Sequence, residues 1–353
     1  IQNLNGDNFP DIIVPNFNKW YYGCQIKFFV LNYSIINPVL IQDLLPSTDA
    51  MPTYTIADIN NDGIQDIIYI ENSKLNNLYQ GKIHYGTSNP NWTNPIDNVW
   101  IPFNIDLNKP AKNIFIGDYN EDGLNDVMVV NDDGYYIYPN INGTINPTPV
   151  ATSTLFNSTY SQIRPGDFNA DGLQDFVLNE RDSPNWYFAI NNGNLGFTKI
   201  PLPLITASGQ DFTDYDNTVD NCLVTDFNND GKSDLIVFDG SYDKHCNIFG
   251  NNCWGSFNNF KTYWYQSTGN NVSLVKTATS TNAADAPYSL YVVGDFNGDG
   301  RSDLMNFGYD CYGGIDMTQK WCMYATPNTN YEGGMVSSIS NGLGQNTSIA
   351  YTT

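Results

Sequence analysis

Residues 118–126 read DYNEDGLND, which is the pattern D-x-N-x-D-G-x-x-D. Four more copies of this pattern occur, at residues 58–66, 167–175, 226–234 and 295–303. A sixth copy at residues 3–11 is weaker, because Asn3 replaces the first Asp and Asn8 replaces the Gly. The copies start at residues 3, 58, 118, 167, 226 and 295. The chain is therefore an internal repeat with a period of roughly 50–70 residues.

Apolar runs lie on both sides of the pattern. In the copy at 118–126, Ile-Phe-Ile (114–116) precedes it and Val-Met-Val-Val (127–130) follows it. The composition is rich in Tyr (24), Phe (19) and Gly (29), which suits short strands joined by tight turns. No long apolar run has the 3.6-residue period of a helix. We therefore predict an all-β fold, a six-bladed β-propeller that forms one domain over residues 1–353, with one four-stranded blade for each repeat.

The pattern also has the chemistry of a calcium loop. Ca²⁺ takes six to eight oxygen ligands, and positions 1, 3, 5 and 9 of the pattern are all Asp or Asn. A backbone carbonyl near position 7 can add another oxygen, and Gly at position 6 allows the sharp turn. The predicted structural ions number about six, and the predicted ligands are Asn3, Asn5, Asp7, Asp11, Asp58, Asn60, Asp62, Asp66, Asp118, Asn120, Asp122, Asp126, Asp167, Asn169, Asp171, Asp175, Asp226, Asn228, Asp230, Asp234, Asp295, Asn297, Asp299 and Asp303.

The charge balance agrees with bound cations. The 353-residue chain has 15 Lys+Arg against 37 Asp+Glu, a formal net charge of −22. Nearly half of the acidic residues are Asp of the six copies, where closely spaced carboxylates repel unless a cation neutralises them. A single copy would suit ordinary turn chemistry equally well, but five near-identical copies favour metal. An acidic surface excludes nucleic acid and anionic membranes as expected partners. No apolar run approaches the roughly 18 residues that a membrane span needs, so we also expect no direct membrane insertion.

These residues resemble the FG-GAP/VCBS repeat family, the integrin-α-type β-propellers. The resemblance rests on the signature Gly-Asp-Phe/Tyr-Asn-x-Asp-Gly-x-x-Asp at residues 117–126, 166–175 and 294–303. Ala57 and Thr225 stand in place of the signature Gly in two other copies. The resemblance implies a propeller whose calcium loops stiffen its hairpins. It does not imply one ligand, because this family includes adhesion receptors, lectins and toxin subunits.

The C-terminal residues carry a second resemblance. Residues 340–351 are similar to the segment that follows the propeller in B subunits of bacterial toxin complexes and in Rhs/SpvB proteins. Residues 341–353 are thus either a closing strand or the start of a following segment. Because the chain starts at a calcium loop, blade one lacks the strand before that loop. We expect residues 346–352 to supply it and so to close the ring.

Six cysteines allow disulfides. Cys246 and Cys253 are close enough in sequence to form a disulfide that closes one loop, and so are Cys311 and Cys322. Cys24 and Cys222 are left to pair with each other or to stay free. Disulfides together with calcium favour an extracellular or cell-surface location. Buried free thiols are the alternative.

No catalytic pattern is visible. His84 and His245 lie in different repeats, which disfavours a zinc site or a Ser-His-Asp triad. We therefore expect a non-catalytic, calcium-stabilised interaction, adhesion or assembly module that binds a protein partner. One alternative is the propeller of a toxin-complex B-type or Rhs protein that docks to a pore-forming subunit. Another is a glycan-binding, lectin-like propeller.

Overall fold

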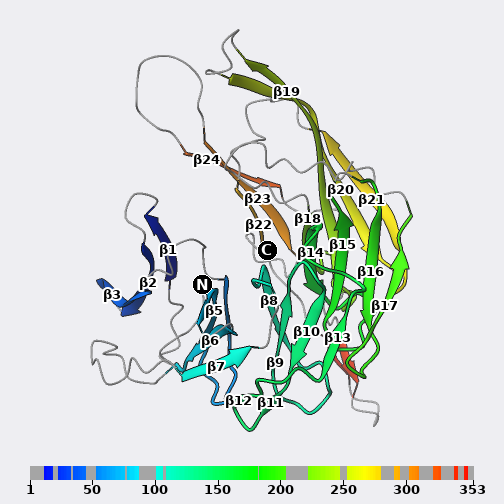
Figure 1. The fold of residues 1–353 in the computed structure, drawn as a ribbon. Helices are drawn as coiled ribbons and strands as arrows, with labels where there is room; N and C mark the ends of the chain where they lie inside the picture. The colour runs from blue at the N-terminus through cyan, green and yellow to red at the C-terminus, as the bar shows by residue number, and fades with distance from the viewer. Residues whose placement is uncertain are drawn as a thin grey trace. The chain divides into compact units, whose positions relative to one another are not determined.

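The chain folds into β-strands (Figure 1). The computed structural model describes residues 12–18, 23–32, 35–44, 53–75, 78–86, 101–105, 109–181, 183–203, 222–246, 253–279, 290–294, 302–309, 321–326, 338–340 and 346–348. Every helix or strand assigned in these ranges is a strand, which confirms the all-β class. No helix that could cross a membrane occurs in them. The chain divides into two compact units, one formed by Ile1–Thr159 with Asn191–Phe197 and one by Tyr160–Ile190 with Thr198–Thr353.

The first unit contains three antiparallel sheets in which strands that follow one another in sequence pair with one another. The first sheet consists of β1 (Ile12–Asn18), β2 (Gly23–Asn32) and β3 (Ile35–Leu44). The second consists of β4 (Thr53–Ala57), β5 (Asp66–Leu75), β6 (Leu78–His84) and β7 (Ile101–Ile105). The third consists of β8 (Asn113–Gly117), β9 (Asp126–Val130), β10 (Tyr135–Tyr138) and β13 (Ala151–Ser153), with the hairpin β11 (Asn140–Ile141) and β12 (Thr144–Ile145) inserted before β13.

The second unit repeats this sequential pairing. One sheet consists of β14 (Tyr160–Gly166), β15 (Asp175–Glu180), β16 (Trp186–Asn191) and β17 (Phe197–Pro201), whose last two strands include residues of the first unit. The next consists of β18 (Cys222–Thr225), β19 (Asp234–Cys246), β20 (Cys253–Ser267) and β21 (Val272–Thr279). The last elements are the sheet of β22 (Leu290–Gly294), β23 (Asp303–Tyr309) and β24 (Trp321–Thr326), and the hairpin of β25 (Ser338–Ser340) and β26 (Asn346–Ser348).

The strand that follows each loop is apolar because the core covers both of its faces. In β19, Leu235 and Val237 join a buried cluster with β15, β16 and β20, whereas Ile236 and Phe238 join a second cluster with Leu304 of β23. Successive side chains of a strand point to opposite faces, so this sheet packs on both sides. Each such buried side chain stabilises the fold by about 1.5–3 kcal/mol.

Neighbouring sheets of the first unit pack in the same way. Ile68 and Ile70 of β5 share a buried cluster with Val127 and Val129 of β9. The two sheets therefore face each other through the strands that directly follow their loops. This packing brings the loops 58–66 and 118–126 within hydrogen-bond distance of each other, as Asn125 shows by donating from Nδ2 to Asp58 O at 2.8 Å.

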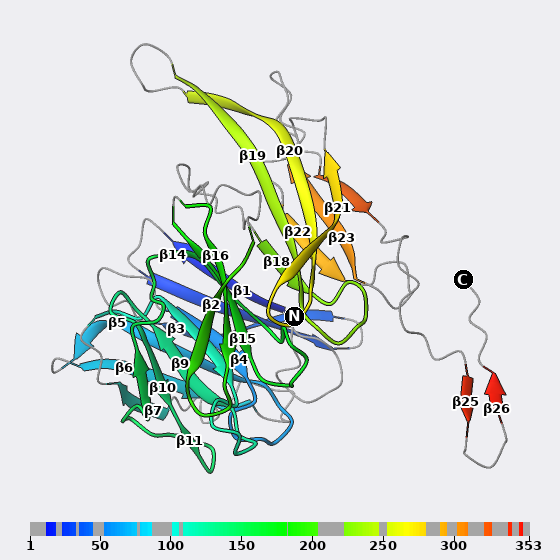
Figure 2. The same cartoon turned by 90° about the vertical axis from the view of Figure 1, so that its right-hand side faces the viewer.

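Strands β19 and β20 form a long hairpin whose far end extends beyond their neighbours (Figures 1 and 2). The last pair in its register is Cys246 opposite Cys253. No disulfide is present among the side chains that the structure describes, and Cys222, which is not in a disulfide, is buried within the core of the second unit. Cys311 lies outside the described residues, so its pairing with Cys322 stays a prediction.

Residues 346–348 form β26, which pairs with β25, and the first sheet contains only β1, β2 and β3 among the described residues. Residues 349–352 lie outside the described residues, so the closing of the ring by residues 346–352 is not confirmed and stays a prediction. The resemblance of residues 340–351 to toxin-complex proteins stays a prediction.

Candidate metal centre

The repeated pattern forms the loop between the first and second strands of a sheet. Loop 58–66 joins β4 to β5, loop 118–126 joins β8 to β9, loop 167–175 joins β14 to β15, and loop 226–234 joins β18 to β19. Loop 295–303 falls in the same place before β23, but only its residues 302 and 303 are described. The predicted ligands of residues 3–11 lie outside the described residues. The site is therefore built from four complete loops.

The backbone of each loop turns through two left-handed residues. At position 6 the glycines Gly63, Gly123, Gly172 and Gly231 have φ of 81–85°. At position 4 the residues Asn61, Glu121, Ala170 and Asn229 have φ of 58–61°. Glycine adopts this region freely and Asn adopts it at modest cost, whereas other residues are strained there. The two turns direct the short side chains of positions 1, 3 and 5 toward the loop's own backbone amides.

The carboxylate at position 1 closes the turn. Asp58 accepts a hydrogen bond from Asp62 N at Oδ1 (3.1 Å) and one from Gly63 N at Oδ2 (2.8 Å). The other three loops repeat both contacts at 3.1–3.2 Å and 2.8–2.9 Å. At position 3 the amide Nδ2 of Asn60 donates to Asp62 Oδ2 at 3.0 Å, and this contact also recurs in each described loop.

The carboxylate at position 9 is buried. Asp66, Asp126, Asp175 and Asp234 have no exposed surface. Each accepts a hydrogen bond from the backbone N–H at position 2, for example from Ile59 to Asp66 Oδ2 at 2.8 Å. In three loops the second oxygen accepts a backbone N–H at the end of the sheet's third strand or just after it, at 2.8 Å from Gly86, Asn140 and Ser267. Position 9 thus ties the loop to the end of its own sheet.

Burial leaves negative charge at this position poorly compensated. It raises the pKa of Asp66 and Asp126 to about 6, and the pKa of Asp234 to about 7. The carboxylates of Asp226 and Asp230 add to the rise at Asp234, which places three acids within electrostatic reach of one another. Backbone hydrogen bonds oppose the rise in each case without cancelling it.

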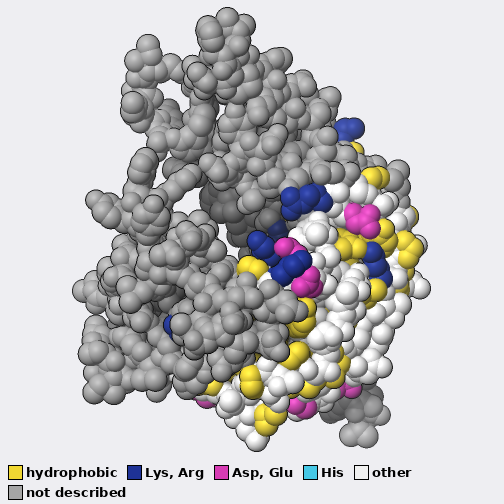
Figure 3. Space-filling view, viewed as in Figure 1, with side chains coloured by type: hydrophobic (Ala, Val, Ile, Leu, Met, Phe, Trp, Pro, Cys, Tyr) yellow, Lys and Arg dark blue, Asp and Glu magenta, His cyan; other side chains and the backbone are white. Residues whose placement is uncertain are grey.

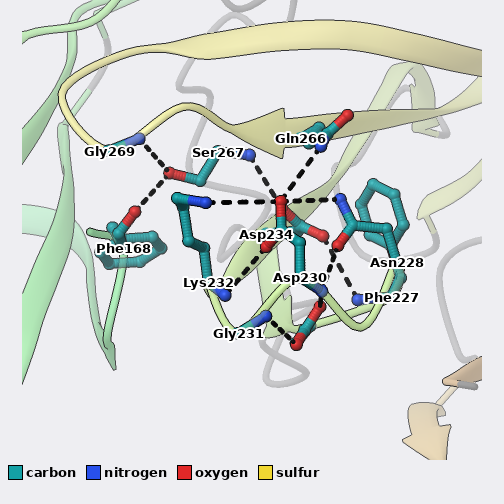
Figure 4. A network of polar contacts seen from close by, with 11 residues as sticks. Phe168, Phe227, Asn228, Asp230, Gly231, Lys232, Asp234, Gln266, Ser267 and Gly269 are labelled. Carbon is teal, nitrogen blue, oxygen red and sulfur yellow. Dashed lines mark hydrogen bonds and ion pairs between the residues drawn. The ribbon is translucent and has the colours of Figure 1, made fainter. Parts of the chain in front are cut away.

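The loop 226–234 shows how cationic and amide groups compensate the carboxylates (Figure 4). Lys232 Nζ lies 3.6 Å from Asp230 Oδ2, and Gln266 Nε2 donates to the same oxygen at 3.2 Å. Asn228 Nδ2 also points at this oxygen, at 3.3 Å. Three positively polarised groups therefore surround the carboxylate of Asp230, at the place where a cation would also be attracted.

The donor set fits a hard divalent cation, although the side chains are turned toward the loop amides. Among the described residues no group of three or more His, Cys, Asp or Glu is gathered as a metal site. Each loop nevertheless offers oxygens from two Asp, one Asn and a buried Asp, and every carboxylate oxygen can accept more than one contact. Asp118, Asn120, Asp122 and Asp126 are one such set. The identity of the ligands stays a prediction.

Reasoning from the sequence missed two features of the loops. The first is position 4, where Asn61 and Asn229 already indicate a left-handed residue. The second is the partner of position 9, which is Asn140 in one sheet and Ser267 in another. Their separation from the loop varies with hairpin length, so no fixed spacing reveals them. Only the end of the third strand marks their place.

The chain was compared with known proteins. The family model described as FG-GAP-like repeat matches residues 118–178, 167–237 and 226–305. No curated protein matches. Similar solved structures include a lectin of Agrocybe aegerita that recognises non-reducing terminal N-acetylglucosamine, at 16% identity and TM-score 0.47, covering 84% of this chain and 74% of that one. The V. cholerae biofilm matrix protein Bap1 is 17% identical at TM-score 0.39, covering 82% and 40%, and the Pseudomonas aeruginosa periplasmic gluconolactonase PpgL is 11% identical at TM-score 0.35, covering 85% and 92%.

These structural similarities are too low to bear on function. The repeat match is different, because it coincides with the loops described above and its three segments together span residues 118–305, more than half of the 353 residues. The resemblance expected from the sequence is confirmed. The chain belongs to the family of proteins with FG-GAP-like repeats.

Proposed function

We propose that this chain is a six-bladed, calcium-stabilised β-propeller that acts outside the cell as a non-catalytic module binding a protein partner. Family membership and the all-β fold support a propeller interaction module. Among the described residues, six sheets have three or four strands paired in sequence order, and in five of them a copy of the pattern lies between the first and second strands. This supports one blade for each repeat. A catalytic role is not proposed, because the clustered acids are engaged with loop amides.

The buried position-9 carboxylate carries the calcium proposal. An acid without exposed surface, close to two further acids, is costly to ionise unless positive charge arrives. In loop 226–234 the ion would be held by Asp226, Asn228, Asp230 and Asp234, with equivalent residues in the other loops. When bound, Ca²⁺ would supply two positive charges and a preference for oxygen ligands. The side chains of these residues hold the loop in its turn by accepting hydrogen bonds from its backbone N–H groups.

Cysteine pairing and location follow from the same proposal. The register of β19 and β20 places Cys246 opposite Cys253, and residues directly opposite in antiparallel strands have Cα atoms about 4.5–5.5 Å apart. That separation suits a disulfide. We propose that these two residues form one, which together with calcium binding favours an extracellular location.

A protein partner suits the described surface. On the face shown in Figure 3, described acidic and basic side chains lie close to one another with apolar side chains between them. Ile141, Val150 and Leu274 are each about half exposed, at 53%, 50% and 50%. A protein interface as a whole is about as apolar as the rest of a protein surface, so this mixture of charged and apolar groups is compatible with a protein partner. The partner can be sought by capture on immobilised protein in calcium, with a calcium-free column as control.

The calcium proposal is tested with two adjacent residues of one loop. Asp122→Ala removes a predicted ligand, whereas Glu121→Ala removes the same charge from a position that is exposed and outside the ligand set. We expect chelation to lower the melting temperature of the native protein and calcium to restore it. Ion stoichiometry, measured by equilibrium dialysis, should fall by one in Asp122→Ala and stay unchanged in Glu121→Ala. Identical melting curves with and without calcium would refute the proposal.

A further inference from the structure

Two neighbouring loops of the first unit are joined by an unbroken chain of hydrogen bonds. Asp66 Oδ2 accepts the N–H of Ile59 at 2.8 Å, and the carbonyl of Ile59 accepts Asn140 Nδ2 at 2.7 Å. The backbone N–H of Asn140 donates in turn to Asp126 Oδ1 at 2.8 Å. The chain therefore runs from the position-9 carboxylate of loop 58–66 to that of loop 118–126. Asn140 is 1% exposed, so this path is closed to solvent.

The second unit builds the same chain with a different side chain. The N–H of Phe168 donates to Asp175 Oδ2 at 3.0 Å, and the carbonyl of Phe168 accepts Ser267 Oγ at 2.7 Å. The backbone N–H of Ser267 donates to Asp234 Oδ1 at 2.8 Å. Figure 4 shows Ser267 between Phe168 and Asp234. Ser267 is also 1% exposed. An amide in one unit and a hydroxyl in the other thus perform the same link.

A parallel contact joins position 8 of one loop to position 1 of the loop before it. Asn125 Nδ2 donates to Asp58 O at 2.8 Å. Ser233 N donates to Asp167 O at 2.6 Å, and Ser233 Oγ accepts Asp167 N at 3.0 Å. The start of one loop, positions 1 and 2, is consequently linked to the end of the next loop, positions 8 and 9. Positions 1 and 9 hold two of the three carboxylates that are predicted ligands in each loop.

We propose that neighbouring loops are energetically coupled, so that an ion bound in one loop raises the affinity of the next, with Asn140 and Ser267 as positioning residues. This rests on the proposed calcium binding. If the position-9 carboxylate shifted toward a bound ion, its hydrogen bond with the position-2 N–H would change. The carbonyl of the position-2 residue accepts a hydrogen bond from the side chain of Asn140 or Ser267. The backbone N–H of Asn140 or Ser267 donates in turn to the position-9 carboxylate of the next loop. Coupling of this kind typically changes an affinity about 5- to 150-fold.

The experiment is a double-mutant cycle on the full chain, read by hydrogen exchange of peptides covering single loops during calcium titration. Asp226→Ala removes the position-1 ligand and so disables loop 226–234, and the readout is the calcium concentration that half-protects loop 167–175. We expect Asp226→Ala to raise this concentration about fivefold or more in the native background. In a Ser267→Ala background the rise should be less than half as large on a logarithmic scale. Ser273→Ala, an exposed serine on β21, is the matched control and should leave the rise unchanged.

The outcomes separate the two proposals. If calcium protects none of the described loops in the native protein, the calcium proposal fails. If calcium protects them but loop 167–175 does not respond to Asp226→Ala, only the coupling fails. If the response is the same with and without Ser267→Ala, Ser267 has no positioning role. Because Ser267 is buried and Ser267→Ala could disturb folding, Asn140→Ala with Asp118→Ala, read at loop 58–66, repeats the test in the other unit.

Discussion

The left-handed residue at position 4 allows a direct test of the loop geometry. Ala170 has φ of 61° and is exposed, while Asn61 and Asn229 occupy the equivalent place at 60° and 58°. A residue with a Cβ pays about 1–2 kcal/mol to adopt this region, and Asn recovers part of that through local hydrogen bonds. Because the side chain is exposed, Ala170→Asn changes little packing. We expect it to stabilise the protein by about 0.5–1 kcal/mol.

The assay is thermal unfolding at fixed calcium concentration. A gain of this size corresponds to a rise in melting temperature of about 1–3 °C in a protein of several hundred residues. Ala170→Ser is the control, because Ser is polar but has less preference for the left-handed region. Glu121→Asn should behave like Ala170→Asn, with Glu121→Gln as its control for charge. A melting temperature for Ala170→Asn at or below that of Ala170→Ser would show that strain at position 4 does not limit stability.

Two further predictions concern pH and redox state. Because burial raises the pKa of Asp66, Asp126 and Asp234 above the ordinary value of 3.8, the calcium-free fold binds protons more readily than the unfolded chain. Its stability should therefore fall as pH rises through 6 and 7, whereas calcium affinity should rise over the same range; melting curves without calcium and calcium titrations at pH 5.5 and 8 check both. For Cys246 and Cys253, we expect a disulfide-linked peptide in non-reducing mass spectrometry and a loss of about 2–3 kcal/mol of stability in Cys246→Ser; free thiols at both positions in protein never exposed to reductant would contradict this.

The loops were predictable from sequence because their geometry is local. Nine residues contain the carboxylates, the amide and the glycine, and the structure places Gly123 at φ 81° with Asp118 accepting its N–H. The strands that follow were predictable for a related reason. A strand covered on both faces must be apolar throughout, as Val127 and Val129 illustrate together with the residues between and beside them.

The contacts between loops were not predictable, because they depend on packing between distant segments. Asn140 follows Asp126 by 14 residues, whereas Ser267 follows Asp234 by 33, since the long hairpin of β19 and β20 lies between. The linking residue is also Asn in one unit and Ser in the other, so no single residue type marks its place in the sequence. The pairing of β26 with β25 was missed for the opposite reason. A short local hairpin costs less chain entropy than a strand that must reach the first sheet.

The buried carboxylates connect the stability of the sheets to the state of the loops. Asp126 accepts hydrogen bonds from Tyr119 in its own loop and from Asn140 after the third strand, so it fixes both ends of the loop to the sheet. Asn140 in turn reaches Ile59 beside the neighbouring sheet's core. A change of charge on one of these carboxylates therefore affects hydrogen bonds between neighbouring sheets and not only groups at the surface. If the loops and the sheet packing are coupled as proposed, the surface would be stiff before binding, and this would lower the entropy cost of docking a partner.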